Sequence, residues 1–474
     1  MTPVSPHHGG PEFFQPATSA ATGPGARRSK CIRFLAVLPS GTRKNQMFGP
    51  PQPAASTNAL SAVESSSTSE PSAAAQNVAS ARASAASNET ALITLAMTGT
   101  IARTMDEYVV IVGAGPAGLA AAWAIRRAGR DPLVVEQADA VAASWRGRHD
   151  HLRLNTHRAF SHQPGARIPR RCGPYPVRDD YVAYLREYSA GMRLRLGTRV
   201  HRIDRTDGGW ELVLDGGSLT ATHVVIATGS DAEPFLPDWP GLDSFGGTVI
   251  HAGQFRNVAE AAGRDVLVVG PGNSGVDLLG YLAASDAGRL WLSARSGMTV
   301  TPRRLGGVPL HPVSITLRRL PVRWQDATAR AVQRLAFGDL GRFGYPRPAL
   351  GPFTRQRTDG VTIAVDDGFA RALKAGRVVM KPGIAGFDGP LVRFTDGTSC
   401  APDAVICATG YRPGIEALAG HLVTLDRRGM PAFMGAASSP EHPGLWFFGL
   451  DSSIYGNMHV RRRQARQLAR AVTR

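Results

Sequence analysis

Apolar and polar positions follow the same arrangement twice along this chain. An apolar run at residues 108–112 is followed by a glycine-rich turn at 113–118 and by an alanine-rich run at 119–128 that is long enough for a helix. A second predicted strand comes at 132–136, and the whole order recurs over residues 265–295. Short apolar runs joined by a glycine turn and a helical run predict two βαβ units with parallel strands.

Other parts of the pattern are shorter or weaker. Apolar runs at 210–214, 223–227 and 404–408 predict further strands, and a basic helix is expected from about residue 458. The Pro- and Arg-rich stretch 302–362 receives no assignment. We therefore predict an α/β fold with two nested Rossmann-like dinucleotide-binding domains.

The chain divides into four segments on this reading. Residues 1–105 are rich in Ser, Ala, Pro and Gly, which predicts a disordered N-terminal tail. An organelle transit peptide and a true start at Met105 are both open alternatives for this tail. Residues 106–236 and 386–474 are predicted to form the first domain, with residues 237–385 inserted between them as the second.

Composition and charge narrow the class of protein. The 474 residues include 54 Lys and Arg against 37 Asp and Glu, a formal net charge of +17. Nearly all the basic residues are arginine, as in proteins from GC-rich genomes, and no known nucleic-acid-binding module is present, so no nucleic-acid partner is expected. No apolar run approaches the ~20 residues of a membrane helix, and no membrane partner is expected. The four cysteines form no Cys-x-x-Cys pair and no metal-ligand spacing, which favours a cytoplasmic protein without a metal site.

The first glycine turn has the spacing of a dinucleotide-binding fingerprint. Gly113 permits the tight turn, Gly115 lets the backbone approach a pyrophosphate, and Gly118 lets the helix pack closely on the strand. Pro116 suits a first helical position, where its missing N–H costs nothing, and Ala117 is included with the turn as a cofactor-binding residue. The helix N-terminus then offers free N–H groups to phosphates.

Glu136 lies 18 residues after the last glycine of that turn, at the end of the next predicted strand. A carboxylate at this position accepts hydrogen bonds from ribose hydroxyls and repels a 2′-phosphate. The first site therefore suits FAD or NAD rather than NADP.

The second turn repeats the fingerprint but not the acid. Its residues are Gly270, Gly272, Asn273, Ser274 and Gly275. Ala294 takes the place of the acid, and Arg295 follows with a guanidinium that suits a 2′-phosphate. Ser293 is expected to add a hydroxyl, and Arg303 and Arg304 are further candidates for phosphate contacts. The second site is therefore predicted to bind NADPH.

One segment between the two turns points to a family. Residues 245–255 match the F-x-G-x-x-x-H-x-x-x-[F/Y/W] signature, so residues 106–474 resemble the single-component (class B) flavin-containing and N-hydroxylating monooxygenases. The Ala-Thr-Gly segments at 227–229 and 408–410 resemble the linkers at which the chain passes between domains in that superfamily. Residues 144–154 are similar to bacterial members and to plant indole-3-pyruvate monooxygenases.

The resemblance implies roles for particular residues. It implies contacts with FAD for Trp145, Arg146, Val200, Thr228 and Gly229. It also places Asn155 beside the isoalloxazine as the candidate catalytic residue. His251 is expected to position loops and NADPH rather than to act as a general base.

The resemblance also implies an activity. NADPH reduces FAD, reduced FAD and O2 form a C4a-hydroperoxide, and one oxygen atom enters a small organic substrate. Three alternatives stay open: a Baeyer–Villiger monooxygenase, a flavin disulfide reductase or NADPH oxidase, and a non-catalytic flavin-binding sensor. Phe255 followed by Arg256 departs from the Baeyer–Villiger pattern, and Cys400 and Cys407 are wrongly spaced for a disulfide reductase.

Overall fold

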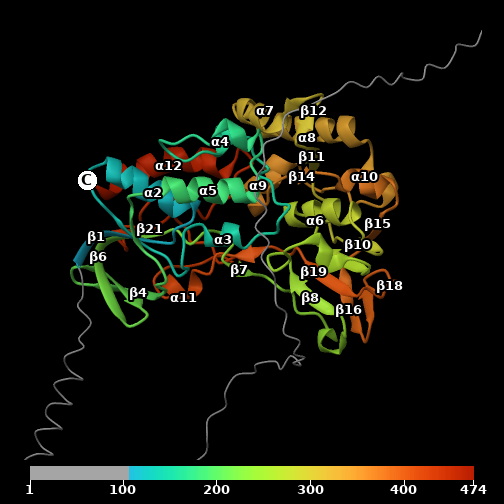
Figure 1. Ribbon diagram of the computed structural model, residues 1–474, viewed down its shortest axis with the longest axis horizontal. Helices are drawn as coiled ribbons and strands as arrows, with labels where there is room; N and C mark the ends of the chain where they lie inside the picture. Colours follow the sequence, from blue (N-terminus) through green and yellow to red (C-terminus); the bar gives the residue numbers. More distant parts are fainter. Residues whose placement is uncertain (1–105) are drawn as a thin grey trace, which may run out of the picture. The chain divides into compact units, whose positions relative to one another are not determined.

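The computed structural model describes residues 106–474, from the first strand to the C-terminus (Figure 1). The predicted disordered tail, residues 1–105, lies outside the described residues. Within the part of the chain that is described, no helix is both long and apolar enough to cross a membrane.

The first βαβ unit belongs to a seven-stranded sheet. Its main path runs β3-β2-β1-β6-β5-β4, and β21 also pairs with β6. The strands are β3 (Arg193–Arg195), β2 (Leu133–Val135), β1 (Asp106–Val112), β6 (Gly217–Ile226), β5 (Gly209–Leu214), β4 (Val200–Thr206) and β21 (Leu445–Phe447). β1 lies parallel to β2 and β6, whereas β4, β5 and β6 form an antiparallel meander.

The apolar run of β1 is continuous because both faces of this sheet are covered. Val109 and Ile111 face a core formed with three helices, whereas Val110 and Val112 face a second core formed with the meander. The three helices are α2 (Pro116–Arg127), α5 (Arg178–Tyr188) and α12 (Asn457–Val472), which lie together beside the sheet in Figure 1. Shorter helices of this part are α3 (Ala143–Arg146), α4 (Arg158–Ser161), η1 (Arg170–Cys172) and α11 (Glu416–Ala419).

The second βαβ unit belongs to a separate, fully parallel sheet of order β15-β10-β9-β19-β8. Its strands are β15 (Val378–Lys381), β10 (Leu290–Ser293), β9 (Val266–Val269), β19 (Ala404–Cys407) and β8 (Thr248–His251). Apolar side chains of α6 (Asn273–Ala283) and α10 (Phe369–Lys374) pack on one face. The other face packs against a small antiparallel sheet of β16 (Ile384–Asp388), β17 (Leu391–Phe394) and β18 (Ser399–Cys400). Two 3₁₀ turns, η2 (Leu242–Ser244) and η3 (Val258–Ala261), precede β9.

This pairing corrects the predicted domain boundary at residue 386. β19 lies between β8 and β9, so it belongs to the second sheet rather than to the first domain. Its four residues are all buried, like those of β9 and β10. An apolar run of this kind predicts a buried strand but does not say which sheet the strand joins, which is why the boundary was placed too early.

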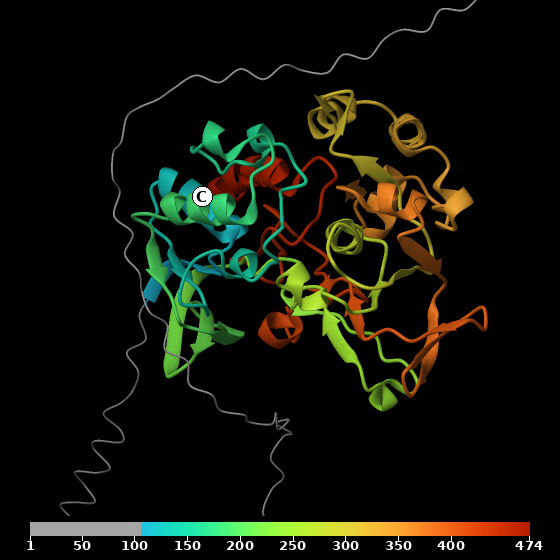
Figure 2. The ribbon, with the colours of Figure 1, turned by 45° about the vertical axis from the view of Figure 1, so that its right-hand side comes forward.

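The stretch 302–362, which had no sequence assignment, lies within a helical layer beside the second sheet. It is framed by a parallel pair of strands, β11 and β14. The elements in chain order are β11 (Val300–Pro302), β12 (Arg304–Leu305), β13 (Val308–Pro309), α7 (Leu310–Leu317), α8 (Val322–Phe337), η4 (Leu340–Phe343), α9 (Pro352–Asp359) and β14 (Ala364–Asp366). Figure 2 shows α7 and α8, in yellow, at the periphery of the described residues.

The chain passes between the two sheets at the two Ala-Thr-Gly segments. Immediately after them, β7 (Glu233–Pro234) pairs antiparallel with β20 (Tyr411–Arg412). The N–H of Phe235 also donates to the carbonyl of Gly410 over 3.0 Å. The outward and return crossings therefore lie side by side.

Candidate active site

Two of the three glycines of the first turn pack against backbone, and the third, Gly115, faces open space. Gly113 has φ +107°, and its N–H donates to the carbonyl of Val135 over 2.7 Å. A Cβ on Gly113 would lie 2.8 Å from the carbonyl oxygen of Ala227, and one on Gly118 would collide with the carbonyl oxygen of Gly113. A Cβ on Gly115 would meet nothing within 4 Å. The open side of Gly115 is the space that a pyrophosphate needs, so this turn fits a dinucleotide.

The helix that follows the turn begins without a side-chain cap. Gly115 is the N-cap of α2, Pro116 stands in its first turn, and no acidic residue lies there. Ala117 is buried. The first N–H groups of α2 therefore lack an intramolecular side-chain acceptor, and an anion can take that place.

Glu136 is fixed beside this turn. Its carboxylate accepts the N–H of Ala114 over 2.7 Å and the N–H of Ala138 over 3.0 Å. Its carbonyl accepts the N–H of Thr198 over 2.9 Å, which brings the start of β4, with the buried Val200, alongside. Glu136 and Val200 are thus neighbouring parts of one site.

The short helix α3 is tied to the same turn. The N–H of Ala142 donates to the carbonyl of Ala114 over 3.1 Å, and Ala142 adopts φ +59°, a left-handed conformation in which Cβ is disfavoured. Trp145 packs against the first core, and Arg146 pairs with Asp139 over 2.7 Å. The Nε of Arg146 is buried and finds no hydrogen-bond partner within residues 106–474.

The first Ala-Thr-Gly segment supplies a second unsatisfied group. The hydroxyl of Thr228 is buried without a hydrogen-bond partner in the described part of the chain. Gly229 has φ +87°, and a Cβ there would meet open space. Buried polar atoms normally have partners, so these groups fit a ligand that supplies them.

The second turn has the same construction. Gly270 has φ +109°, and its N–H donates to the carbonyl of Ser293 over 2.9 Å. A Cβ on Gly270 would lie 2.5 Å from the carbonyl oxygen of Ala408, and one on Gly275 would collide with Gly270. Gly272 is the N-cap of α6, again without a side-chain cap.

At the end of its second strand, the second βαβ unit differs from the first as the sequence predicts, except at Ser293. Ala294 directly follows β10, as Glu136 follows β2, and Arg295 is exposed, with no ion pair or hydrogen bond to its guanidinium among residues 106–474. Ser293, by contrast, is only 2% exposed, and its hydroxyl donates to the carbonyl of Pro382 over 2.7 Å. The hydroxyl that Ser293 was expected to add to the second site is therefore bonded within the protein, because every residue of β10 faces a covered side of the sheet.

Asn155 and Asn273 join the two units. The Nδ2 of Asn155 donates to the Oδ1 of Asn273 over 3.1 Å. That Oδ1 also accepts the N–H of Val365 over 2.9 Å, while the Nδ2 of Asn273 donates to the carbonyl of Ile363 over 2.9 Å. The Oδ1 of Asn155 accepts Arg303 over 3.0 Å. These partners fix the orientation of both amides. Ser274, next to Asn273 in α6, is half-buried.

Arg303 lies in a different environment from the one that the sequence predicted. It is not a free phosphate contact: its side chain is 9% exposed and binds Asn155 and Asp367. Asp277 of α6 lies 3.9 Å from the same guanidinium. Burial raises the pKa of Asp277 to about 7, and the positive charge of Arg303 opposes that rise. The sequence contains one signal for this arrangement. Asp277 is an acid within the apolar run of α6, and a buried acid of this kind needs a cation beside it.

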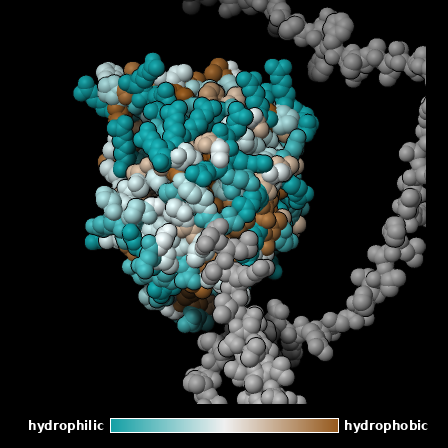
Figure 3. All heavy atoms as spheres, turned by 90° about the vertical axis from the view of Figure 1, so that its left-hand side faces the viewer, coloured by the Kyte–Doolittle hydropathy of each residue, from teal (hydrophilic) through white to brown (hydrophobic). Residues whose placement is uncertain are grey.

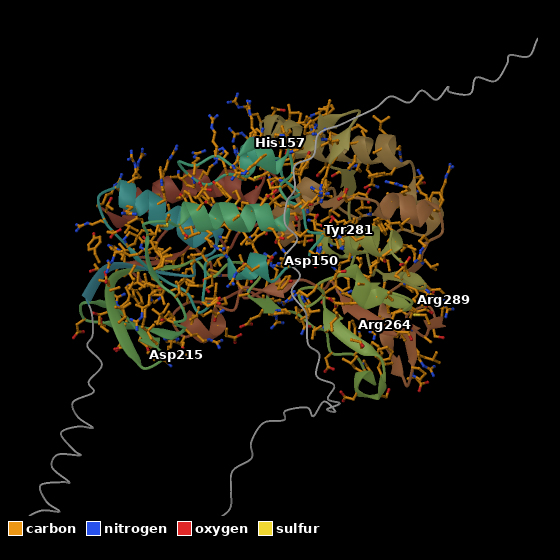
Figure 4. All side chains as sticks on the ribbon, viewed as in Figure 1. Asp150, His157, Asp215, Arg264, Tyr281 and Arg289 are labelled. Atoms are coloured by element: carbon orange, nitrogen blue, oxygen red, sulfur yellow. The ribbon has the colours of Figure 1, made fainter. Side chains whose placement is uncertain are left out.

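Figure 4 shows Asp150 and Tyr281 close together at this junction. Tyr281 stacks on His151 with ring centroids 5.2 Å apart, and its hydroxyl donates to Asp367 over 3.2 Å. Asp150 accepts the side-chain amide of Asn257 over 2.9 Å. The loop before Asn155 is therefore bound to the second unit at several points.

His251, the histidine of the family signature, lies beneath the crossing strands. It is 1% exposed, and its Nε2 lies 2.9 Å from the carbonyl of Gly410, while its Nδ1 accepts the N–H of Gly253 over 3.0 Å. Burial lowers its pKa, so the ring is neutral with its proton on Nε2. Its edge-to-face partner Tyr411 accepts a hydrogen bond from Arg148. Both ring nitrogens are therefore occupied in hydrogen bonds.

The cysteines offer no redox pair in the described part of the chain. Cys172, Cys400 and Cys407 are free and buried. Burial raises the pKa of Cys400 to about 11 and that of Cys407 to about 12, so both thiols stay protonated. A disulfide reductase needs a reactive thiolate beside its flavin.

Comparison with known proteins identifies the family. A pyridine nucleotide-disulphide oxidoreductase family profile matches residues 110–299. The chain is 36% identical over 327 residues to indole-3-pyruvate monooxygenase YUCCA1 of Oryza sativa subsp. japonica, covering 67% of this chain and 80% of that protein. It is 32% identical to a probable indole-3-pyruvate monooxygenase, YUCCA3 of Arabidopsis thaliana, covering 65% of this chain and 73% of that protein.

Solved structures agree with this result. A flavin-containing monooxygenase from Stenotrophomonas maltophilia superposes with a TM-score of 0.57 at 25% identity, covering 78% of this chain and 98% of that one. A steroid monooxygenase bound to NADP, at 20% identity and a TM-score of 0.60, shares the fold over 78% of this chain and 85% of its own. The resemblance inferred from the sequence is thus confirmed: the chain belongs to the family of the YUCCA indole-3-pyruvate monooxygenases and is an FAD- and NADPH-dependent flavin monooxygenase.

Proposed function

We propose that the first glycine turn binds FAD, that the second binds NADPH, and that the reaction takes place where Asn155 meets Asn273. The observation that carries this assignment is the 3.1 Å hydrogen bond between these two amides. Asn273 is the first residue of α6, directly after the second turn, and Asn155 comes from the first unit. The bond therefore brings the carboxyl-end crevices of the two sheets together, which is where ligands of such sheets bind.

The strand ends support the division of cofactors. Glu136 presents a carboxylate beside the first turn, which suits the ribose of FAD and excludes a 2′-phosphate. At the second turn the corresponding residue is Ala294, and Arg295 follows it with a guanidinium that forms no ion pair within residues 106–474. A free cation at this position favours the 2′-phosphate of NADPH.

When bound, FAD and NADPH supply the redox chemistry and the activation of O2. The residues of the chain orient them. The N-termini of α2 and α6 receive the pyrophosphates, and Thr228 and Arg146 supply buried donors that have no partner in residues 106–474. One N–H of the Asn155 side-chain amide donates to Asn273, and its second N–H is left to donate to the bound cofactor.

His251 contributes by position rather than by proton transfer. Its hydrogen bond to Gly410 holds the return crossing against the signature strand β8. The loop at Gly253, also bonded to this ring, lies against Tyr411 of the same crossing. We assign it the role of fixing how the two cofactor units meet.

The substrate is proposed to be a small aromatic α-keto acid. Two relatives above 30% identity carry indole-3-pyruvate in their names. The protonated thiols of Cys400 and Cys407 count against disulfide reduction. The cytoplasmic location expected from the sequence remains a prediction.

The coupling of NADPH oxidation to oxygenation tests the proposed function. With indole-3-pyruvate present, we expect one O2 and one NADPH to be consumed per oxygenated product, with little H2O2. H2O2 equal to NADPH consumed, whatever substrate is offered, would identify an oxidase. Ester formation from simple ketones would identify a Baeyer–Villiger enzyme, and failure of NADPH to bleach the bound flavin would contradict the two-cofactor assignment.

Arg295→Ala is expected to weaken NADPH much more than NADH. Loss of a charge-assisted contact of about 1.5–3 kcal/mol corresponds to roughly a 10- to 150-fold higher KM for NADPH. The matched control is Arg289→Ala at the opposite end of β10, where the side chain pairs with Asp265. Equal losses for NADPH and NADH in Arg295→Ala would show that this residue does not recognise the 2′-phosphate.

Asn155→Ala is expected to retain FAD but to release more H2O2 per NADPH. The change removes the amide at the junction, whereas the FAD turn keeps all of its own contacts. The flavin content of the purified protein and the H2O2-to-NADPH ratio measure the two effects. Asn257→Ala removes another amide contact between the same segments, to Asp150, and should leave the ratio unchanged. An unchanged H2O2-to-NADPH ratio in Asn155→Ala would contradict the role assigned to Asn155.

Gly115→Ala and Gly118→Ala separate cofactor binding from folding. The Cβ of Gly115→Ala enters open space, so the apoprotein should unfold as the parent does while FAD affinity falls at least about tenfold. The Cβ of Gly118→Ala meets a backbone carbonyl and should destabilise the apoprotein by about 1–3 kcal/mol. Urea unfolding measures the stability of the apoprotein, and titration with FAD measures its affinity for the cofactor. Wild-type FAD affinity in Gly115→Ala would place the pyrophosphate elsewhere.

A further inference from the structure

The helix α8 buries two polar side chains and exposes two large apolar ones, while Val322 and Phe337 at its ends pack against cores. Gln325 and Asp326 are 0% and 4% exposed, whereas Trp324 is 58% and Leu335 is 75% exposed. The inner polar groups are fully used: Gln325 binds the carbonyl of Leu320 and the hydroxyl of Tyr455, over 2.7 and 2.6 Å. A helix packed on a core normally shows the reverse arrangement.

The inner face holds α8 firmly in place. Asp326 accepts the N–H of Phe353 over 2.7 Å and the hydroxyl of Thr354 over 2.5 Å at the start of α9. Gln333 accepts the N–H of Val300 over 2.8 Å. The orientation of α8 is therefore set by specific polar contacts, and its outer apolar residues cannot turn inward without breaking them.

The exposed apolar positions form one stripe. Trp324, Ala327, Ala331 and Leu335 follow the i, i+3, i+7, i+11 spacing of a single helical face, and all four are exposed. Leu320, 44% exposed, extends the stripe into the turn before α8. Single exposed apolar side chains are ordinary, as on the mostly hydrophilic face in Figure 3, but a continuous stripe marks an interaction surface.

Arginines accompany the stripe. Arg323, Arg330 and Arg334 lie on one flank at helical spacing, and Arg318 and Arg319 precede Leu320 in the turn. All five are exposed, and within residues 106–474 none forms an ion pair. The acid of α8 is the buried Asp326. This face, which we call the α8 surface, is thus apolar along its centre and purely cationic at its edge.

We propose that the α8 surface binds the headgroup layer of an anionic lipid membrane, with the helix lying flat. An interfacial helix combines Trp and Leu on the side that enters the headgroups with Arg that attracts anionic lipid, and it needs no spanning segment. The expectation of no membrane partner was based on the absence of such a segment. α7 and α8 also lie at the periphery of the described residues, where a flat surface can reach them (Figures 1 and 2).

Two other possible partners match the positive charge of the α8 surface less well. A second copy of the chain would bring five arginines against five arginines. The segment 1–105 is itself basic, with eight Lys and Arg against four Asp and Glu. Neither supplies the negative charge that the α8 surface lacks.

Vesicle sedimentation of the full-length, FAD-loaded protein tests the proposal. We expect little binding to phosphatidylcholine vesicles and strong binding when phosphatidylglycerol is included, decreasing at high salt. Trp324→Ser with Leu335→Ser should reduce the partition coefficient at least about tenfold, and so should Arg323→Gln with Arg330→Gln and Arg334→Gln. NADPH oxidation and the melting temperature of these variants should match the parent, since the residues lie outside the active site.

The matched control removes three exposed arginines from α12: Arg463→Gln, Arg466→Gln and Arg470→Gln. It has the same net charge as the α8 arginine variant and should bind vesicles as the parent does.

Equal loss in both triple variants would show attraction by net charge alone and overturn the assignment to α8. Absence of phosphatidylglycerol-dependent binding would overturn it as well. A dimer that becomes a monomer in Trp324→Ser with Leu335→Ser would instead identify the stripe as an interface between copies.

Discussion

In each unit the first glycine of the turn rests against the carbonyl oxygen of an Ala-Thr-Gly segment, Gly113 against Ala227 and Gly270 against Ala408. The third glycine of each turn rests in the same way on the first. Because these contacts join backbone to backbone, no side chain can be inserted without separating strand, helix and crossing segment. The glycine turns therefore pack directly against the segments that cross between the sheets, and this packing fixes where the two sites lie relative to each other.

The junction is specified by a second kind of constraint, the direction of hydrogen bonds. The N–H of Val365 fixes which end of the Asn273 amide is the acceptor, and that acceptor fixes Asn155 as a donor. Arg303 occupies the remaining acceptor of Asn155. The buried guanidinium of Arg303 also pairs with Asp367 and lies 3.9 Å from Asp277, and such pairing is a weak source of stability, since desolvation offsets most of the attraction. Its retention is better explained by the orientation that it gives to Asn155.

The features predicted correctly from sequence are those that short-range geometry determines. The turn glycines, the start of α2 at Pro116 and the acid at Glu136 all depend on neighbours within one βαβ unit. The features missed depend on contacts distant in sequence. The run at 404–408 predicts a strand but not its sheet, and Arg303 looks like any other arginine until α6 brings Asp277 beside it. Most of the α/β fold and the geometry of the two glycine turns were therefore readable, whereas the partners at the junction were not, and the cofactor contacts of these residues stay predictions.

The excess of arginine has two physical consequences that depend on burial. Arg461 of α12 is 7% exposed and donates to the carbonyl of Gly449, which packs on Ala117 of the first turn, while Arg303 lies near Asn273 of the second. Burial of each guanidinium costs free energy that an anionic dinucleotide nearby would offset, so cofactor binding and stability should be linked. Exposed arginines such as Arg295 and those of the α8 surface carry no such desolvation cost. Their attraction for anions extends into solvent and weakens with salt, so it favours encounter as well as binding.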